Sequence, residues 1–123
     1  MKENLVLLGS TGSIGEQTLD IVRENPDRFE ITTLTARSNW QRLAEQAREF
    51  GADSVVIADE RFYEPLKETL KREPVKVYAG AEAVEQCCEN GSVHTVVNAL
   101  VGYAGLHPTV AALKTGKKLA LAN

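Results

Sequence analysis

Residues Leu5 to Gly15 have the sequence LVLLGSTGSIG, and this segment is the strongest indication of the fold. It starts with a short, continuous apolar run, as expected for a strand buried on both faces of a sheet. A glycine-rich turn follows, and apolar residues then recur at mostly helical spacing from Ile14 to Glu24. A strand, a glycine turn and a helix in this order predict the phosphate-binding turn of a dinucleotide-binding domain.

The three glycines of this turn, Gly9, Gly12 and Gly15, have separate physical roles. One reverses the chain, one lets the backbone approach a pyrophosphate, and one lets the helix pack closely on the sheet. The N–H groups at the helix start would face the phosphate oxygens, and the hydroxyls of Thr11 and Ser13 could add hydrogen bonds. The spacing is GxxGxxG and not GxGxxG, so a purely structural turn is the alternative. No Lys-Ser or Lys-Thr pair follows, which argues against a P-loop.

The rest of the chain alternates β-branched runs with amphipathic segments. The pattern predicts further strands at 31–35, 54–58, 75–78, 93–100 and 118–122, and helices at 39–50, 81–88 and 108–115. Asp59 is a candidate N-cap for the charged segment after it, whose helix Pro65 would delay or kink. This alternation predicts an α/β fold, a Rossmann-like doubly wound parallel sheet with helices on both faces. One domain would span residues 1–123.

Composition limits the function classes. The chain has 123 residues, 43% hydrophobic and 25% charged, as in an ordinary globular domain. Its net charge of −3 argues against nucleic acid as the main partner. No apolar stretch is long enough for a membrane span or a signal peptide, and the adjacent Cys87 and Cys88 have no metal-site spacing. We therefore expect no nucleic-acid or membrane partner, and a reducing, cytoplasmic location.

The end of the second predicted strand indicates which dinucleotide is bound. Domains that bind NAD usually place an acid there, for the ribose hydroxyls. Here Arg37, Ser38 and Asn39 follow the strand, and none is acidic. Arg37 could pair with the 2′-phosphate of NADP, with Ser38 and Asn39 donating to the same phosphate. Alternatively, Ser38 or Asn39 caps the next helix and Arg37 is solvated; both interpretations can hold together. We predict NADP(H).

A second glycine-containing loop, residues 97–109, leaves a later strand and enters a predicted helix. Ligands lie at the carboxyl ends of strands in this architecture, so the loop is well placed to border the nicotinamide. Ala99 and Leu100, at its start, are therefore predicted cofactor-binding residues together with Gly9 of the first turn.

At this point the chain resembles a known family over essentially its whole length. The motifs are Leu8–Gly15 (LGSTGSIG), Thr18-Leu19-Asp20, Asn98–Gly102 (NALVG), Gly105-Leu106, Pro108-Thr109 and Leu121-Ala122-Asn123. Together and in this order they are similar to the N-terminal, NADPH-binding domain of 1-deoxy-D-xylulose 5-phosphate reductoisomerases.

The resemblance implies an oxidoreductase of non-mevalonate isoprenoid biosynthesis, a homodimer that needs NADPH and a divalent metal, magnesium or manganese. Such enzymes rearrange the sugar phosphate 1-deoxy-D-xylulose 5-phosphate to an aldehyde and reduce it to 2-C-methyl-D-erythritol 4-phosphate. It further implies that Thr11, Gly12, Ser13 and Ile14 contact the pyrophosphate. Arg37–Asn39 would hold the 2′-phosphate, and Asn123 would lie near the nicotinamide. Many members have glycine where Arg37 stands, and the added cation should favour NADPH.

In the family, the last strand continues into a Lys-Glu pair, and the metal-binding carboxylates lie further on. This sequence stops at Leu121-Ala122-Asn123, so we expect a fragment of a longer enzyme that binds cofactor without turnover. Asp59, Glu60 and Glu64 are expected at a solvated helix start and not at a metal.

The sequence leaves two other functions open. Another NADP-dependent reductase, such as a semialdehyde dehydrogenase, would need a catalytic cysteine, but Cys87 and Cys88 lie in a predicted helix without an obvious partner base. A regulatory module that senses nicotinamide redox state would also lack catalytic residues. The sequence beyond Asn123 would distinguish these functions from a reductoisomerase.

Overall fold

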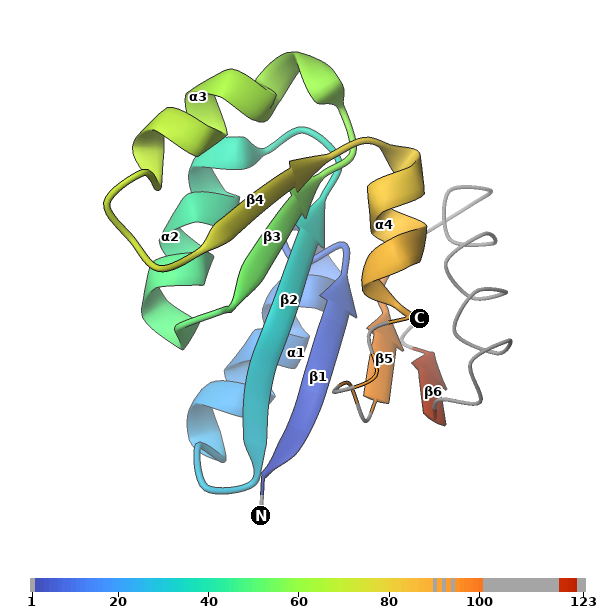
Figure 1. Ribbon diagram of the computed structural model, residues 1–123. Helices are drawn as coiled ribbons and strands as arrows, with labels where there is room; N and C mark the ends of the chain where they lie inside the picture. Colours follow the sequence, from blue (N-terminus) through green and yellow to red (C-terminus); the bar gives the residue numbers. More distant parts are fainter. Residues whose placement is uncertain (1, 90, 92, 94, 101–117, 122–123) are drawn as a thin grey trace.

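The computed structural model describes residues 2–89, 91, 93, 95–100 and 118–121, and Figure 1 shows their arrangement. Six described strands form one sheet in the order β4-β3-β2-β1-β5-β6, with every neighbouring pair parallel. The elements are β1 (Glu3–Leu8), α1 (Ser13–Glu24), β2 (Phe29–Ala36), α2 (Trp40–Phe50), β3 (Ser54–Ile57), η1 (Glu60–Phe62), α3 (Tyr63–Thr69), β4 (Lys76–Ala79), α4 (Ala81–Cys87), β5 (Thr95–Asn98) and β6 (Lys118–Leu121).

The strand order reverses at β1. The chain builds outward from β1 through β2 and β3 to β4, and then crosses back to place β5 on the other side of β1 (Figure 1). β1 therefore pairs with both β2 and β5. In doubly wound sheets, ligands bind at such a switch point, outside the carboxyl ends of the strands. The glycine turn follows β1 and so lies at this point.

Helices pack on both faces of the sheet, and each face has its own apolar core. On one face, side chains of α1, α2 and α3 pack against the strands; this core includes Leu5, Leu7, Leu19, Leu34, Leu43, Val55, Ile57 and Leu66. On the other face, α4 contributes Val84 to a smaller core with Val6, Leu8, Val56, Cys88, Val93 and Val96. This arrangement confirms the predicted Rossmann-like doubly wound fold.

A bulge in the pairing of β1 with β2 was not predicted. Leu5 pairs with Ile31, but the next residue, Val6, pairs with Thr33, so Thr32 is an extra residue in β2. Side chains of a regular strand alternate between faces, and residues three apart would face opposite sides. With the extra residue, Ile31 and Leu34 both enter the core under α1 and α2.

Most predicted elements occur within a few residues of their expected bounds. Gly51 closes α2 in the left-handed conformation, with φ +62°, as expected for a C-terminal cap. Asp59 caps the 3₁₀ turn η1 by accepting from the Arg61 N–H, and α3 begins only afterwards, at Tyr63. Pro65 lies in the first turn of α3, where the N–H that proline lacks has no helical partner anyway.

The predicted helix at 108–115 lies outside the described residues. Within the described part of the chain, no helix is long and apolar enough to cross a membrane.

Candidate functional site

The glycine turn after β1 lies between the carboxyl ends of β2 and β5. The N–H groups of Gly9 and Ser10 both donate to the Thr35 carbonyl oxygen, at 3.0 and 2.8 Å. Gly9 has φ +78°, which favours glycine. A Cβ atom at this position would lie 3.0 Å from Cδ2 of Leu100 and 3.4 Å from the Ala99 backbone. The turn therefore packs directly against the start of the second predicted loop.

The other two glycines of the turn face different surroundings. A Cβ atom on Gly15 would overlap the Gly9 carbonyl oxygen and lie 2.7 Å from Cα and C of Ser10. Only glycine fits there, because the first turn of α1 packs against the backbone of the turn. Among the described residues, a Cβ atom on Gly12 would meet just the Gly9 oxygen, at 3.8 Å. The described part of the chain therefore leaves open space beside Gly12.

The start of α1 has backbone N–H groups without hydrogen-bond acceptors inside the helix. Gly12 is the N-cap residue, and no side chain caps the helix. The first N–H groups of any helix have no partner within it, and the helix dipole adds positive charge at the same end. Gly12 and Ser13 are exposed, while Thr11 and Ile14 are partly buried. The residues predicted to bind a pyrophosphate thus lie together at an accessible helix start, a place that suits anions in general.

The residues after β2 lie next to this turn, because Thr35 of β2 accepts hydrogen bonds from Gly9 and Ser10. Arg37, Ser38 and Asn39 are all exposed. The Asn39 side chain accepts a hydrogen bond from the Arg42 N–H at 3.3 Å and so caps α2, which confirms the capping interpretation for Asn39. Contact of these three residues with a 2′-phosphate stays a prediction.

An acid also lies near Arg37, but it follows β3 and not β2. The N–H of Asp59 donates to the Arg37 carbonyl oxygen at 2.9 Å. Hydrogen bonds from Arg61 lower the pKa of Asp59 to about 2, and the charge of Arg37 contributes. Asp59 is therefore ionised at neutral pH and is bound by Arg61, with an Nη2–Oδ2 distance of 2.6 Å.

The residues after β5 complete the described edge of the site. The Ala99 N–H donates to the Leu8 carbonyl oxygen at 2.9 Å, and the Leu100 N–H donates to Oδ1 of Asn98 at 3.0 Å. Both residues are partly buried beside Gly9, as predicted for a loop at the strand ends. Asn123 and the loop from residue 101 onward lie outside the described residues.

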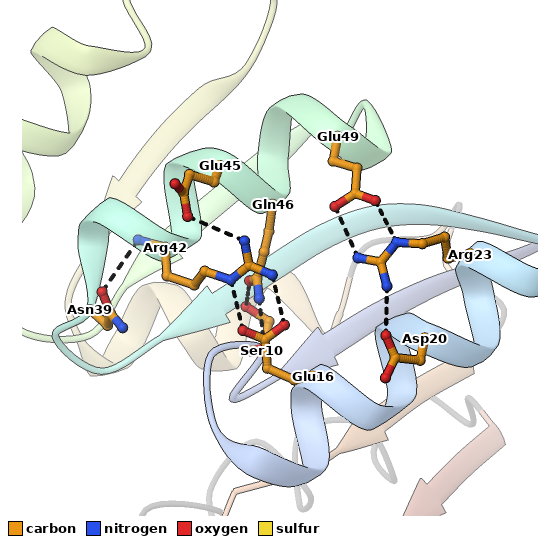
Figure 2. A network of polar contacts seen from close by, with 9 residues as sticks. All are labelled: Ser10, Glu16, Asp20, Arg23, Asn39, Arg42, Glu45, Gln46 and Glu49. Carbon is orange, nitrogen blue, oxygen red and sulfur yellow. Dashed lines mark hydrogen bonds and ion pairs between the residues drawn. The ribbon is translucent and has the colours of Figure 1, made fainter.

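Sequence reasoning missed two residues that hold the turn in place. The Ser10 hydroxyl donates to Oε1 of Gln46 at 2.6 Å, and Nε2 of Gln46 donates to the Ser10 carbonyl oxygen at 3.0 Å (Figure 2). Both residues are 0% exposed. The signal that could have found them is Gln46 itself, a polar residue at helical spacing from Leu43 and Phe50 on the apolar face of α2.

The cysteines and acids elsewhere do not form a catalytic site in the described structure. Cys87 is partly buried and Cys88 buried, and neither is part of a disulfide. The hydrogen bond with Cys88 and burial raise the pKa of the Cys87 thiol, which disfavours a reactive thiolate. Among the described residues, no three histidine, cysteine or acidic side chains come together as a possible metal site.

Comparison with known families agrees with this geometry. The family model for 1-deoxy-D-xylulose 5-phosphate reductoisomerase matches residues 5–123. The chain belongs to this family. A reductoisomerase from Phocaeicola vulgatus is 51% identical over 123 residues, and one from Porphyromonas gingivalis is 48% identical. Each match covers 100% of this chain and 32% of the relative, so the chain spans about a third of the length of these reductoisomerases.

Solved reductoisomerase structures superpose closely on the chain. The enzyme from Zymomonas mobilis in complex with NADPH has a TM-score of 0.94 and 41% sequence identity, covering 100% of this chain and 32% of its own. A second reductoisomerase, in complex with NADPH, fosmidomycin and magnesium, has a TM-score of 0.91 at 34% identity, covering 95% of this chain and 29% of its own. The Rossmann-like sheet is thus the fold of this part of the family.

Proposed function

We propose that residues 1–123 form the NADPH-binding domain of a longer 1-deoxy-D-xylulose 5-phosphate reductoisomerase. The observation that carries the proposal is the uncapped start of α1 at the switch point of the sheet, beside the open space at Gly12. A pyrophosphate there would accept from the N–H groups of the first turn, with hydroxyl donors from Thr11 and Ser13. Reductoisomerases of the same fold occur in complex with NADPH, which supports this assignment.

The choice of NADPH over NADH rests on the charges after β2. No acid occupies the end of β2, and Arg37, Ser38 and Asn39 are exposed beside the turn. A 2′-phosphate would pair with the Arg37 guanidinium, accept from Ser38, and meet the positive end of the α2 dipole. The Asn39 oxygen already accepts from Arg42, so its amide nitrogen would be the donor to the phosphate.

The proposal extends to the reaction of the longer protein. Bound NADPH would supply the hydride that reduces the rearranged sugar phosphate to 2-C-methyl-D-erythritol 4-phosphate. The role of this chain's residues is to hold the cofactor, with Ala99, Leu100 and Asn123 bordering the nicotinamide. The described residues offer no donor set for magnesium or manganese. Without the metal-binding carboxylates that the family resemblance implies, the 123-residue chain should bind cofactor and should not convert substrate.

Two further properties belong to the proposal for the longer protein. We propose that it works in the cytoplasm, since Cys87 and Cys88 of this chain form no disulfide, which fits a reducing compartment. We also propose that the longer protein is a homodimer, as the family resemblance implies.

Titration calorimetry of the 123-residue chain with NADPH and NADH at low salt tests the cofactor assignment. We expect tighter binding of NADPH, by tenfold or more, which corresponds to about 1.4 kcal/mol. Arg37→Ala should reduce that preference. Arg72→Ala removes the same charge from an exposed position that precedes β4, at the amino ends of the strands. It should leave the preference for NADPH unchanged. Equal affinities for the two cofactors would refute the 2′-phosphate site, and no binding of either would refute cofactor binding by this domain.

A further inference from the structure

Two ion pairs join α1 to α2, and one of them lies at the start of both helices (Figure 2). Arg42 donates from Nε to Oε2 of Glu16 at 2.7 Å and from Nη2 to Oε1 at 3.0 Å. Its third nitrogen, Nη1, donates to Oε1 of Glu45 at 3.2 Å. The side chains of Arg42 and Glu16 are 34% and 36% exposed, so both are partly shielded from solvent.

The pair lies between the two helix starts to which the proposed function assigns phosphates. Glu16 is in the first turn of α1, just after the predicted pyrophosphate site. Arg42 is in the first turn of α2, three residues after the cap Asn39 in the predicted 2′-phosphate segment. Any charge left unbalanced on either side chain would act on both the pyrophosphate and the 2′-phosphate of a bound NADPH.

The sign of that effect differs for the two residues. A carboxylate in the first turn stabilises a helix by itself, but it repels a phosphate that binds to the same turn. Arg42 cancels this repulsion with a two-point ion pair. The hydrogen bond with Arg42 lowers the pKa of Glu16, so the acid is ionised and paired at neutral pH. Conversely, Glu16 and Glu45 limit how much positive charge Arg42 offers to a ligand.

We propose that the Glu16–Arg42 pair sets the strength of NADPH binding, with Arg42 as a positioning residue that neutralises the acid between the two phosphate sites. This inference rests on the proposed function. It assigns a role in cofactor affinity to residues of α1 and α2 outside the glycine turn and outside the segment after β2.

Four variants test the pair by the sign of their effects on NADPH binding, measured by calorimetry at low salt. Arg42→Gln should weaken binding by about threefold to tenfold, because Glu16 and Glu45 lose their counter-charge. Glu16→Gln should tighten it by a similar factor. Arg42→Lys, which keeps the charge but loses the two-point geometry, should stay within about twofold, as should the double variant Glu16→Gln with Arg42→Gln. The effects of Arg42→Gln and Glu16→Gln should shrink as salt is added.

The second ion pair between the same helices provides a matched control. Arg23 pairs with Glu49 at the far ends of α1 and α2, away from both helix starts (Figure 2). Arg23→Gln and Glu49→Gln should change NADPH affinity by less than about twofold at low salt. Thermal unfolding of every variant checks that it is folded. Glu16→Gln keeps an acceptor for Arg42, so it tests the sign of the change in NADPH affinity even if Arg42→Gln unfolds.

The outcomes separate this inference from the proposed function. If Glu16→Gln and Arg42→Gln both weaken binding, the pair is only structural and the inference is wrong. A control variant that shifts the affinity as much as Arg42→Gln would also contradict it. If the unsubstituted chain binds no NADPH, the proposed function fails, and the inference fails with it.

Discussion

Gly12 and Gly15 of the glycine turn differ in what a Cβ atom would contact. Gly15 is required by the fold, because a Cβ atom would overlap the Gly9 carbonyl oxygen. Gly12 is not required by the fold: it has φ −80°, which any residue adopts, and open space beside it. Two glycines of one motif therefore serve different ends, one for packing of the helix and one for access of a ligand.

This difference predicts opposite results for the same substitution. Gly15→Ala should lower the free energy of unfolding by about 3 kcal/mol, because the backbone around Ser10 must shift. Gly12→Ala should change it by less than about 1 kcal/mol, since alanine adopts the native conformation there. The new methyl group should nevertheless weaken NADPH binding by tenfold or more, about 1.4 kcal/mol. Urea unfolding and calorimetry measure the two effects; a large loss of stability in Gly12→Ala would contradict the assignment.

Helix α2 fixes the glycine turn that precedes α1 through side-chain hydrogen bonds. The reciprocal hydrogen bonds between Ser10 and Gln46 are fully buried and satisfy both side chains and the Ser10 carbonyl oxygen. The Glu16–Arg42 pair joins the same two helices at the surface. The turn, the start of α1 and the start of α2 are thereby held in one arrangement before any ligand binds, which reduces the entropy cost of ligand binding.

Removing the buried link should destabilise the chain measurably. Gln46→Leu leaves the Ser10 hydroxyl and carbonyl oxygen buried without partners, which costs about 1–3 kcal/mol. Adding Ser10→Ala should recover part of the loss, because the buried Ser10 hydroxyl without a partner is then removed. The matched control is Gln41→Leu at an exposed position of α2, expected within about 0.5 kcal/mol of the original. Urea unfolding measures all three, and equal losses in Gln46→Leu and Gln41→Leu would contradict a role for the buried link.

For the whole molecule, ionised carboxylates contribute to stability through ion pairs with arginine. Hydrogen bonds from Arg42 and Arg23 lower the pKa values of Glu16 and Glu49 from the ordinary 4.5. Arg61 lowers that of Asp59 from 3.8 to about 2. In each case the folded chain binds the proton less well than the unfolded chain. The stabilising contribution is therefore complete above the unfolded value and disappears as the pH falls through the folded one.

This linkage predicts the pH dependence of unfolding. The free energy of unfolding should be nearly constant from pH 7 to about pH 5 and should then decrease as the pH falls below 4.5, the ordinary value of the two glutamates. The double variant Glu16→Gln with Glu49→Gln should be less stable at pH 7 and should lose less stability between pH 5 and pH 3. Urea unfolding across this range measures both slopes. Parallel slopes for the two proteins would show that these pairs do not cause the acid sensitivity.

Much of the fold could be predicted from local patterns. The apolar run before Gly9 predicted β1, the helical spacing after it predicted α1, and Gly51 marked the end of α2. These signals are local because strand and helix periodicity, together with the restricted backbone of non-glycine residues, act over a few neighbouring residues. The same locality explains why Ser38 and Asn39 were the two cap candidates before α2, of which the structure shows Asn39 to be the cap.

The α/β class, the glycine turn after the first strand and the lack of an acid after the second strand all follow from the order of residues along the chain. How distant residues meet depends on tertiary packing. Ser10 and Gln46 are 36 positions apart, and Glu16 and Arg42 are 26 apart. Their contacts depend on the rotation of α1 and α2 about their axes and on the bulge at Thr32, which sets the register between β1 and β2. No local periodicity encodes these quantities, because they follow from how whole elements pack.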